Sequence, residues 1–292
     1  MTVLGVLVVG LLLASYLGML HGLGDSLAVV RPGLAAVAVV LGGLLAAAKP
    51  RWPGTAVVVA GLGAAAPVLW SSLPTQAGDG AAYLVYQKNL SFRLADPAPL
   101  IADIAAHAPD FVTLQEVTDR TRAVMTGLVD MLPAQHWCPF AAVGGVAVLS
   151  RWPMIAVTAR CADGDGLAAM QVAAPEGPLW IVSIHLHWPF PYRQSEQLAR
   201  LLPMLASLDG PTVIGGDFNM VPWSYTLKAI AQATGTERAG SITYSLPMAG
   251  GWLTLPIDHV LVPQGKGPTH AQRLPLLGSD HHGVLARFAR PG

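Results

Sequence analysis

The sequence is short of charge. Only 12% of its 292 residues are Asp, Glu, Lys or Arg, whereas 53% are hydrophobic, and its mean hydropathy is +0.50. An ordinary soluble domain has about one quarter charged residues, so part of this chain is expected to lie in a membrane. No charged residue precedes Asp25, and the stretch from Gly54 to Leu73 also has none. From Thr75 onward the composition is that of a soluble domain.

An excess of basic charge is also missing. The whole chain has 17 basic and 17 acidic residues, and from Thr75 onward it has 14 basic and 16 acidic residues, a net of −2 with His neutral. A protein that holds nucleic acid by its phosphates normally has a basic patch or a high pI. Any phosphate binding here is therefore expected to be local and to depend on a metal ion.

The sequence has only two cysteines, Cys138 and Cys161. Both fall in the predicted soluble part, and the segment between them reads as two strands around "RWP", so the two thiols could lie near each other. If this part faces an oxidising compartment, a disulfide is permitted. We favour that disulfide over two separate buried thiols.

Three apolar runs approach the ~20 residues needed to cross a bilayer. They cover roughly residues 3–20, 34–48 with possible extension at either end, and 55–73, and we expect residues 1–74 to form a membrane segment of about three transmembrane helices. Lys49 and Arg51 lie between the second and third runs, which predicts that this loop is cytoplasmic. The protein is then a multi-pass membrane protein with its soluble domain on the extracytoplasmic side. A cleaved signal peptide is the alternative, but the first run lacks a basic n-region.

Residues 75–292 are expected to form one soluble domain. Short apolar strands alternate with amphipathic helices, and the strands are joined both by hairpins and by helical crossovers. A purely parallel sheet does not fit these mixed connections. The pattern predicts an α/β fold, a four-layer α/β/β/α sandwich of two mixed sheets flanked by helices.

Polar residues gather where the predicted strands end. They are carboxylates, amides and imidazoles, and no Ser or Cys nucleophile motif accompanies them. Carboxylate and amide oxygens suit a hard cation such as Mg²⁺, and a carboxylate or His can activate an attacking water. This inventory indicates metal-assisted phosphoryl hydrolysis. The residues are Asn89, Glu116, His185, His187, Asp217, Asn219, Asp258, His259, Ser279, Asp280, His281 and His282.

Seven segments in this order resemble the endonuclease/exonuclease/phosphatase superfamily, the DNase-like metal-dependent phosphoesterases, and the chain is interpreted as a membrane-anchored member. The segments are "YQKNLSF", "TLQEV", "GVAVLSRWP", "VSIHLHWP", "GGDFNMVP", "IDHVLV" and "GSDHHGV". The resemblance extends over residues 83–288. One such segment would be weak evidence, but seven in order are strong. The resemblance implies a two-sheet sandwich with Mg²⁺, or Mn²⁺, as cofactor.

The resemblance implies a metal site and a catalytic site. Glu116 would be the main metal ligand, supported by Asn89 and Asp280. These three residues come from two strand ends and from the segment near the end of the chain.

The same resemblance implies five catalytic residues. Asp217 would align or deprotonate the attacking water, and Asn219 would bind a phosphate oxygen. His281 would lie beside the phosphate, with its tautomer fixed by Asp258, and His185 would be a second imidazole that donates a proton or binds phosphate.

The remaining polar and glycine residues have more ordinary interpretations. We expect His187 to lie at the rim, and His259 and His282 to point away from the site because they alternate with site residues. Gly215 and Gly216 are expected to let the backbone approach a phosphate without side chains in the way.

The sequence thus predicts a membrane-anchored, divalent-metal-dependent phosphoesterase. Its substrate would be a phosphodiester or phosphomonoester in nucleic acid, a phospholipid head group or a small molecule. The lipid bilayer would be its other partner, through the amino-terminal helices, and no protein partner is predicted. The alternative is a catalytically silent relative of the same fold that binds a ligand.

Overall fold

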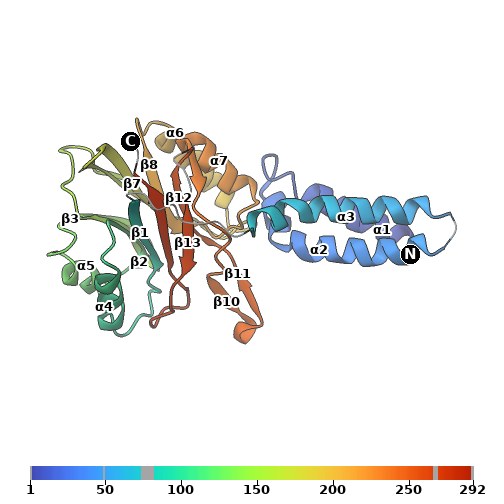
Figure 1. The fold of residues 1–292 in the computed structure, drawn as a ribbon, viewed down its shortest axis with the longest axis horizontal. Helices are drawn as coiled ribbons and strands as arrows, with labels where there is room; N and C mark the ends of the chain where they lie inside the picture. Colours follow the sequence, from blue (N-terminus) through green and yellow to red (C-terminus); the bar gives the residue numbers. More distant parts are fainter. Residues whose placement is uncertain (1, 49, 74–81, 266–268, 291–292) are drawn as a thin grey trace.

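A computed structural model describes residues 2–48, 50–73, 82–265 and 269–290. Lys49 and the predicted domain boundary at residues 74–75 lie outside these ranges. The chain forms a body of two sheets and a long helical arm, and the amino terminus lies near the far end of the arm (Figure 1).

One six-stranded sheet, sheet A, has the order β13-β14-β1-β2-β4-β3. Only β1 and β2 pair in parallel, and the other neighbours in this sheet are antiparallel. The strands are β1 (Ala82–Asn89), β2 (Phe111–Val117), β3 (Ala134–Ala141), β4 (Gly144–Ser150), β13 (His270–Arg273) and β14 (Val284–Ala289).

The second six-stranded sheet, sheet B, has the order β5-β6-β7-β8-β12-β9, with β7 and β8 parallel. A separate hairpin of β10 (Leu246–Met248) and β11 (Leu253–Leu255) is joined by the short 3-10 helix η1 (Ala249–Gly251). The strands of sheet B are β5 (Arg160–Ala162), β6 (Leu167–Ala174), β7 (Gly177–His185), β8 (Thr212–Asp217), β9 (Thr236–Arg238) and β12 (Asp258–Pro263).

The predicted four-layer sandwich is confirmed. Side chains of both sheets, such as Val85 and Ile181, share one buried cluster between the sheets. Helices α4 (Ala98–His107) and α5 (Ala123–Gly127) pack on the outer face of sheet A. Helices α6 (Gln194–Ala206) and α7 (Tyr225–Thr234) pack on the outer face of sheet B. Because the central strands are covered on both faces, they read as nearly continuous apolar runs.

The arm consists of α1 (Thr2–Ala14), α2 (Gly22–Ala46) and α3 (Trp52–Ser71). The first helix is shorter than the expected run, and the second extends further toward the amino terminus, at the end where an extension was allowed for. Helix α1 ends at Ala14 instead of reaching residue 20, and α2 begins at Gly22 instead of residue 34. The His21 side chain accepts a hydrogen bond from the backbone N–H of Leu23 (3.1 Å) and so caps α2.

Small residues let the arm helices pack closely. A Cβ at Gly61 would lie 2.8 Å from the Ala35 carbonyl oxygen, and one at Gly42 would lie 2.7 Å from the Val58 nitrogen. Such close contacts between backbones are typical of helices that associate in membranes. Two helices, α2 and α3, are long and apolar enough to cross a membrane, and α1 is a shorter apolar helix.

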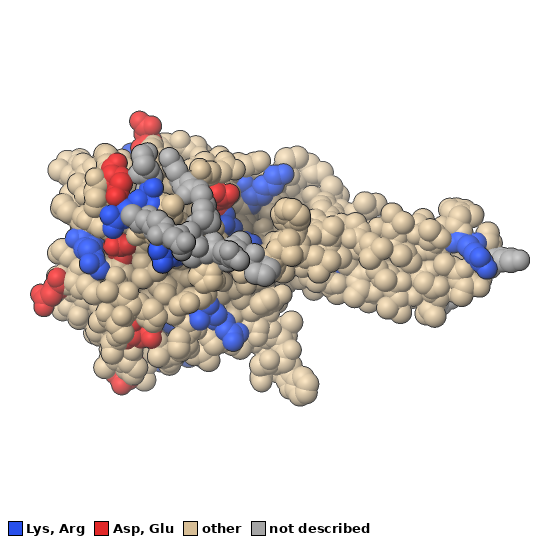
Figure 2. Space-filling model, viewed as in Figure 1, with Lys and Arg blue, Asp and Glu red and all other residues tan. Residues whose placement is uncertain are grey.

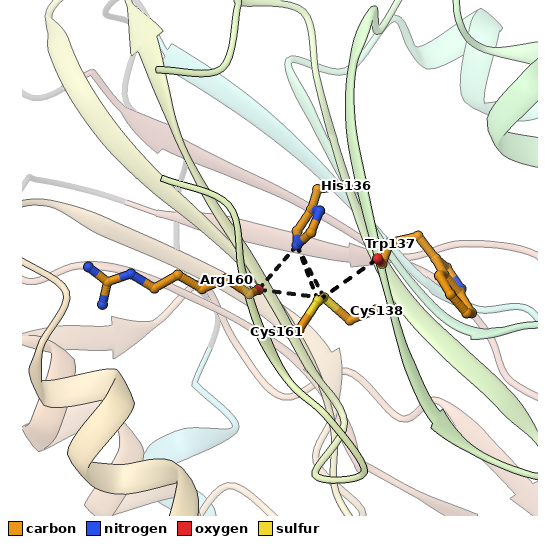
Figure 3. The surroundings of a disulfide bond; sticks show 5 residues. All are labelled: His136, Trp137, Cys138, Arg160 and Cys161. Atoms are coloured by element: carbon orange, nitrogen blue, oxygen red, sulfur yellow. Dashed lines mark hydrogen bonds between the residues drawn. A yellow bond between two sulfur atoms is a disulfide. The ribbon is translucent and has the colours of Figure 1, made fainter. Parts of the chain in front are cut away.

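The disulfide between Cys138 and Cys161 is confirmed, with a Cα–Cα distance of 5.5 Å. It joins β3 of sheet A to β5 of sheet B, and the ring of His136 lies beside it, 3.2 Å from the Arg160 carbonyl oxygen (Figure 3). Although His136 and the two sulfur atoms are close enough together to suggest a metal site, the sulfurs are bonded to each other. They are therefore not available as thiolate ligands.

Candidate active site

Strand pairing brings the predicted site residues to one end of the sandwich. In sheet B, His185 is paired with Asp217 across the parallel strands β7 and β8, and Asp258 is paired with Asp217 across β12 and β8. In sheet A, Asn89 at the end of β1 pairs with the residue before Glu116. The neighbouring strands alone therefore gather these polar side chains.

Asp217 lies at the centre of this group. Its Oδ2 atom accepts a hydrogen bond from Asn89 Nδ2 (3.0 Å) and lies 3.7 Å from the Nε2 atoms of both His185 and His281. Its Oδ1 atom accepts a hydrogen bond from the Asn219 backbone N–H (2.9 Å). The residue is 1% exposed, so both its oxygens are held in a fixed orientation.

His281 is held by Asp258. The Nδ1 atom of His281 lies 2.8 Å from Asp258 Oδ2, and Gln87 donates a hydrogen bond to the other oxygen of Asp258 (3.0 Å). Burial lowers the pKa of His281, but the charges of Asp258 and Asp217 outweigh it and raise the pKa to about 10. The His281 Nδ1–H is thus directed at Asp258, which leaves Nε2 facing Asp217.

Asp217 and His185 have opposite pKa shifts. Burial and the negative charge of Asp258 raise the pKa of Asp217 to about 7. Burial and the charge of His281 lower the pKa of His185 to about 3, so its imidazole is neutral. The His185 Nδ1 atom is buried without a hydrogen-bond partner among the described residues. A carboxyl group with a pKa near neutrality can exchange a proton with water under physiological conditions.

Glu116 sits at a β-bulge. The register of β2 shifts between Gln115 and Val117, and Glu116 has a positive φ of 57°, a conformation that non-glycine residues rarely adopt. The bulge turns its carboxylate toward Phe92 N–H (2.7 Å) and Asn89 Nδ2 (3.2 Å). Burial raises the pKa of Glu116.

Asn89 lies between two carboxylates. Its Nδ2 donates to both Glu116 and Asp217, while its Oδ1 accepts from the Ser91 N–H (2.9 Å). An N–H can bond only to the oxygen of the amide, so this orientation is fixed by Ser91. The predicted role of Asn89 as a metal ligand would require its side chain to turn.

Asp280 and Asn219 lie at the margins of the group. Asp280 is exposed, and its negative charge contributes to the raised pKa of Glu116. Asn219 has a φ of 48° and donates its side-chain amide to the Leu186 carbonyl oxygen (2.7 Å). Their predicted roles, as a metal ligand and a phosphate ligand, stay predictions.

The three histidines that were expected to lie at the rim or to point away from the site contact backbone or aromatic groups. His259 Nε2 lies 2.8 Å from the Met220 carbonyl oxygen, and His282 Nδ1 lies 2.8 Å from that of Leu274. The ring of His187 contacts Phe140.

The expected role of Gly215 and Gly216 is wrong. A Cβ at Gly215 would lie 3.1 Å from Thr113 Cβ in the facing sheet, and one at Gly216 would lie 3.0 Å from the Ile184 carbonyl carbon. Both glycines are buried in strand β8. They allow the sheets and strands to pack closely, not the approach of a phosphate.

Sequence reasoning missed a row of buried amides beneath the site. Gln87 Nε2 donates to Gln115 Oε1 (2.8 Å) as well as to Asp258, and Gln115 Nε2 donates to Ser183 Oγ (3.0 Å). All three are fully buried between the sheets. The sequence signal for this row was the presence of Gln87 and Gln115 inside otherwise apolar strands, just before Asn89 and Glu116.

Comparison with known proteins decides the family. A family model described as Endonuclease/Exonuclease/phosphatase family matches residues 86–281, which is more than half of the chain and includes the eight predicted site residues. The chain belongs to the endonuclease/exonuclease/phosphatase family. No curated protein gives a significant match.

Solved structures agree on the fold. An endonuclease/exonuclease/phosphatase from Beutenbergia cavernae is 20% identical, with a TM-score of 0.56 over 72% of each chain. A sphingomyelinase C from Streptomyces griseocarneus is 14% identical, with a TM-score of 0.51 over 72% of this chain and all of that one. A Staphylococcus aureus beta toxin mutant with bound magnesium ions is 10% identical, with a TM-score of 0.50 over 72% of this chain and 100% of that one.

The donor set of this family member fits a hard divalent cation. Glu116, Asp217 and Asp258 converge, and among the described residues no Lys or Arg forms an ion pair with any of them. Asp217, Asp258 and His281 have ligand atoms within 4.8 Å of one another, but both oxygens of Asp258 are already hydrogen-bonded. Both oxygens of Glu116 also accept hydrogen bonds, but Glu116 is partly exposed whereas Asp217 and Asp258 are buried. An ion can therefore reach Glu116 more easily, and it is the better-suited ligand.

Proposed function

We propose that this protein is a divalent-metal-dependent phosphoesterase that hydrolyses phosphodiester or phosphomonoester bonds. The observation that carries the proposal is the meeting of His185, His281 and Asn89 at one oxygen of Asp217. Two imidazoles in opposite charge states beside a carboxyl group of near-neutral pKa form a proton-transfer site. Packing of the hydrophobic core does not explain why these charged side chains are buried together, because burying charged groups is costly.

The residues divide the chemistry among them. Asp217, as a carboxylate, would orient a water and accept its proton. The water oxygen would bond to phosphorus as the ester P–O bond breaks, and the leaving oxygen would take up a proton from solvent. His281, held as a cation by Asp258, would donate a hydrogen bond through Nε2 to a phosphate oxygen that gains charge, and neutral His185 would contact a second oxygen. A Mg²⁺ or Mn²⁺ ion, held by Glu116 with Asp280 and, after its side chain turns, Asn89, would supply positive charge to the phosphate. The bound magnesium of the beta toxin neighbour supports that choice.

A substrate panel tests the proposal. The full chain in detergent is assayed with bis(p-nitrophenyl) phosphate, p-nitrophenyl phosphate, a single-stranded oligonucleotide and phospholipid vesicles, each with Mg²⁺, Mn²⁺ or Ca²⁺. We expect hydrolysis of at least one substrate that stops with EDTA and returns with excess Mg²⁺. Binding of a panel member without turnover under every condition would instead support the catalytically silent alternative.

We further propose that the arm lies in a bilayer. Most of its surface is apolar, and only 33% of the most apolar 18 residues of α2 and 22% of those of α3 are buried, whereas a core helix would be mostly buried. Trp52 and Trp70 are 73% and 78% exposed on α3. Their separation of 18 positions corresponds to about 27 Å, close to the hydrocarbon thickness that aromatic belts flank.

The catalytic domain is proposed to be extracytoplasmic. Arg51 lies at the far end of the arm from the body, where Figure 2 shows basic atoms, and Ser71 at the near end accepts hydrogen bonds from Arg238 and Ile242. Basic residues favour the cytoplasmic side. The disulfide supports an oxidising compartment for the body.

Reporter fusions test this orientation. An alkaline phosphatase reporter, which needs an oxidising compartment, is expected to be active when fused after Gly292 and inactive when inserted at Arg51. The matched control replaces it with a fluorescent protein that matures only in the cytoplasm, for which we expect the reverse pattern. Active phosphatase at both positions would contradict a membrane-spanning arm.

A further inference from the structure

The arm is joined to the body by a buried carboxylate. Asp25, in the first turn of α2, is 4% exposed, although it lies between the first two predicted apolar runs. Its Oδ1 accepts a hydrogen bond from the Tyr225 N–H (2.8 Å), and its Oδ2 accepts from the Thr226 N–H (2.9 Å) and hydroxyl (2.6 Å). Ser224 caps the next N–H of α7. The arm therefore caps a helix of the catalytic domain.

The chain makes room for this contact. A Cβ at Gly18 would lie 2.7 Å from Tyr225 Cβ and would also collide with the Asp25 carboxylate. A Cβ at Gly24 would overlap the backbone of the segment from Leu17 to Gly18. The two glycines thus permit the turn between α1 and α2 to pack directly on the start of α7.

A proline inside α2 provides a second link. Pro32 has no N–H, so the carbonyl of Ala28, four residues earlier, receives no helical hydrogen bond from it. The indole N–H of Trp223 donates to this carbonyl instead (2.7 Å). Trp223 lies four residues after Asn219. Pro32 would weaken an isolated helix. Here the carbonyl that it leaves free binds Trp223, which belongs to the segment between the site and α7.

The contact extends to both site loops through Gln194. The Thr226 hydroxyl donates its one proton to Asp25, and its oxygen packs against Gln194 Oε1 at 3.4 Å. Gln194 is 2% exposed, and its Nε2 donates to the carbonyl oxygens of Phe218 (3.1 Å) and His187 (2.5 Å). Phe218 separates Asp217 from Asn219, and His187 follows His185 by two residues.

We propose that the arm is a structural support of the active site and that Asp25 is a positioning residue. It fixes the start of α7 and, through Thr226 and Gln194, the backbone of residues 217–219 and 185–187. The arm is therefore not a passive tether, and a catalytic domain without it lacks part of the framework of its own site. The kinetic consequence rests on the proposed phosphoesterase function, whereas the structural consequence does not.

Hydrogen exchange of the full chain in detergent tests the structural part. In Asp25→Ala we expect faster amide exchange both in residues 223–228 and in the site loops 185–190 and 217–221. Asp96→Ala is the matched control, because Asp96 accepts a hydrogen bond from Ala98 N–H at the start of α4, outside the network of the site. Faster exchange confined to residues 223–228 in Asp25→Ala would overturn the proposal and leave Asp25 as a simple helix cap.

Kinetics with bis(p-nitrophenyl) phosphate and Mg²⁺ test the catalytic part. Thr226→Val keeps the shape of the side chain and removes the hydroxyl, and we expect kcat to fall about tenfold with little change in KM, as misplaced catalytic groups cause. Thr226→Ser keeps the hydroxyl and should restore kcat. Equal kcat for both variants would overturn the proposed link, and absence of all turnover in wild type would instead refute the phosphoesterase assignment, with hydrogen exchange still deciding the role of Asp25.

Discussion

Replacing Asp217 by Asn is expected to reduce kcat for the best phosphate ester by about 10³-fold, within the range that general acid or base catalysis supplies. The amide keeps the size of the side chain and can still accept the Asn219 N–H, but it cannot take a proton from water. It also removes the partner of His185 and His281. Asp217 contacts His185, His281 and Asn89, and no other described side chain is placed to replace it.

The pH profile gives the same residue a second test. Burial and Asp258 raise the pKa of Asp217 to about 7, so its carboxylate form is present above this pH and is lost as the pH falls through it. Wild-type kcat/KM should therefore decline below about pH 7, and this limb should be absent in Asp217→Asn. Because the folded-state pKa of Asp217 is raised, ionising its carboxyl group lowers the stability of the wild type at higher pH. Above pH 7 the Asp217→Asn variant should therefore be at least as stable as the wild type.

Asp209→Asn is the control for this substitution. Asp209 is an exposed residue of the loop before β8, and its backbone carbonyl accepts a hydrogen bond from the Trp180 indole, whereas no described residue is bonded to its carboxylate. The same change of carboxylate to amide should leave its kinetics as in wild type. Wild-type kcat in Asp217→Asn, or a loss of activity matched by Asp209→Asn, would contradict the role assigned to Asp217.

Local sequence was enough to place most of the site, because strand ends converge by topology. Asn89, Glu116, His185 and Asp217 lie at or near the ends of apolar strands, and Asp258 begins the antiparallel strand β12 opposite Asp217. Pairing within the two sheets brings these residues together. The pairing of His281 with Asp258 was implied by the family resemblance alone, since its distance of 23 positions carries no local pattern.

What the sequence could not supply are features set by contacts between distant segments. The bulge at Glu116 and the buried row of Gln87 and Gln115 depend on how two sheets face each other. Gly215 was misread for the same reason, since Thr113 of the facing sheet determines what fits there. Polar residues inside apolar strands could be noticed, but their partners could not be named.

The ends of the first two arm helices also differ from the expected runs, because they depend on contacts between distant segments. Hydropathy placed the start of the second helix after Arg31 and Pro32, where charge and a helix breaker coincide. In the structure Arg31 is buried and donates to Ser15 Oγ (2.8 Å) and to the Trp223 carbonyl oxygen (3.3 Å), so the helix continues back to Gly22. A tertiary contact thus overrides the local preference.

Replacing Glu116 by Gln should lower activity at 1 mM Mg²⁺ by about 100-fold, the scale at which altered ligand shells reduce metal affinity or activity. Glu116 supplies an anionic oxygen at a site where burial already raises its pKa. Gln keeps one oxygen and can still accept the Phe92 N–H, so folding should be preserved, but the negative charge that attracts a divalent cation is lost. Titration with Mg²⁺ and with Mn²⁺ measures the change.

The shape of that titration separates a metal ligand from a structural residue. If Glu116 binds the ion, the concentration of Mg²⁺ that gives half-maximal activity should rise in Glu116→Gln, and high Mg²⁺ should recover part of kcat. Glu237→Gln is the matched control, since the Glu237 side chain accepts a hydrogen bond from the Gly265 N–H at the edge of sheet B, away from the site, and its Mg²⁺ dependence should equal that of wild type. If the half-maximal Mg²⁺ concentration is unchanged and kcat is reduced, Glu116 lies beside the reacting phosphate and does not bind the metal. The metal would then be placed at Asp217, Asp258 and His281, whose ligand atoms lie within 4.8 Å of one another.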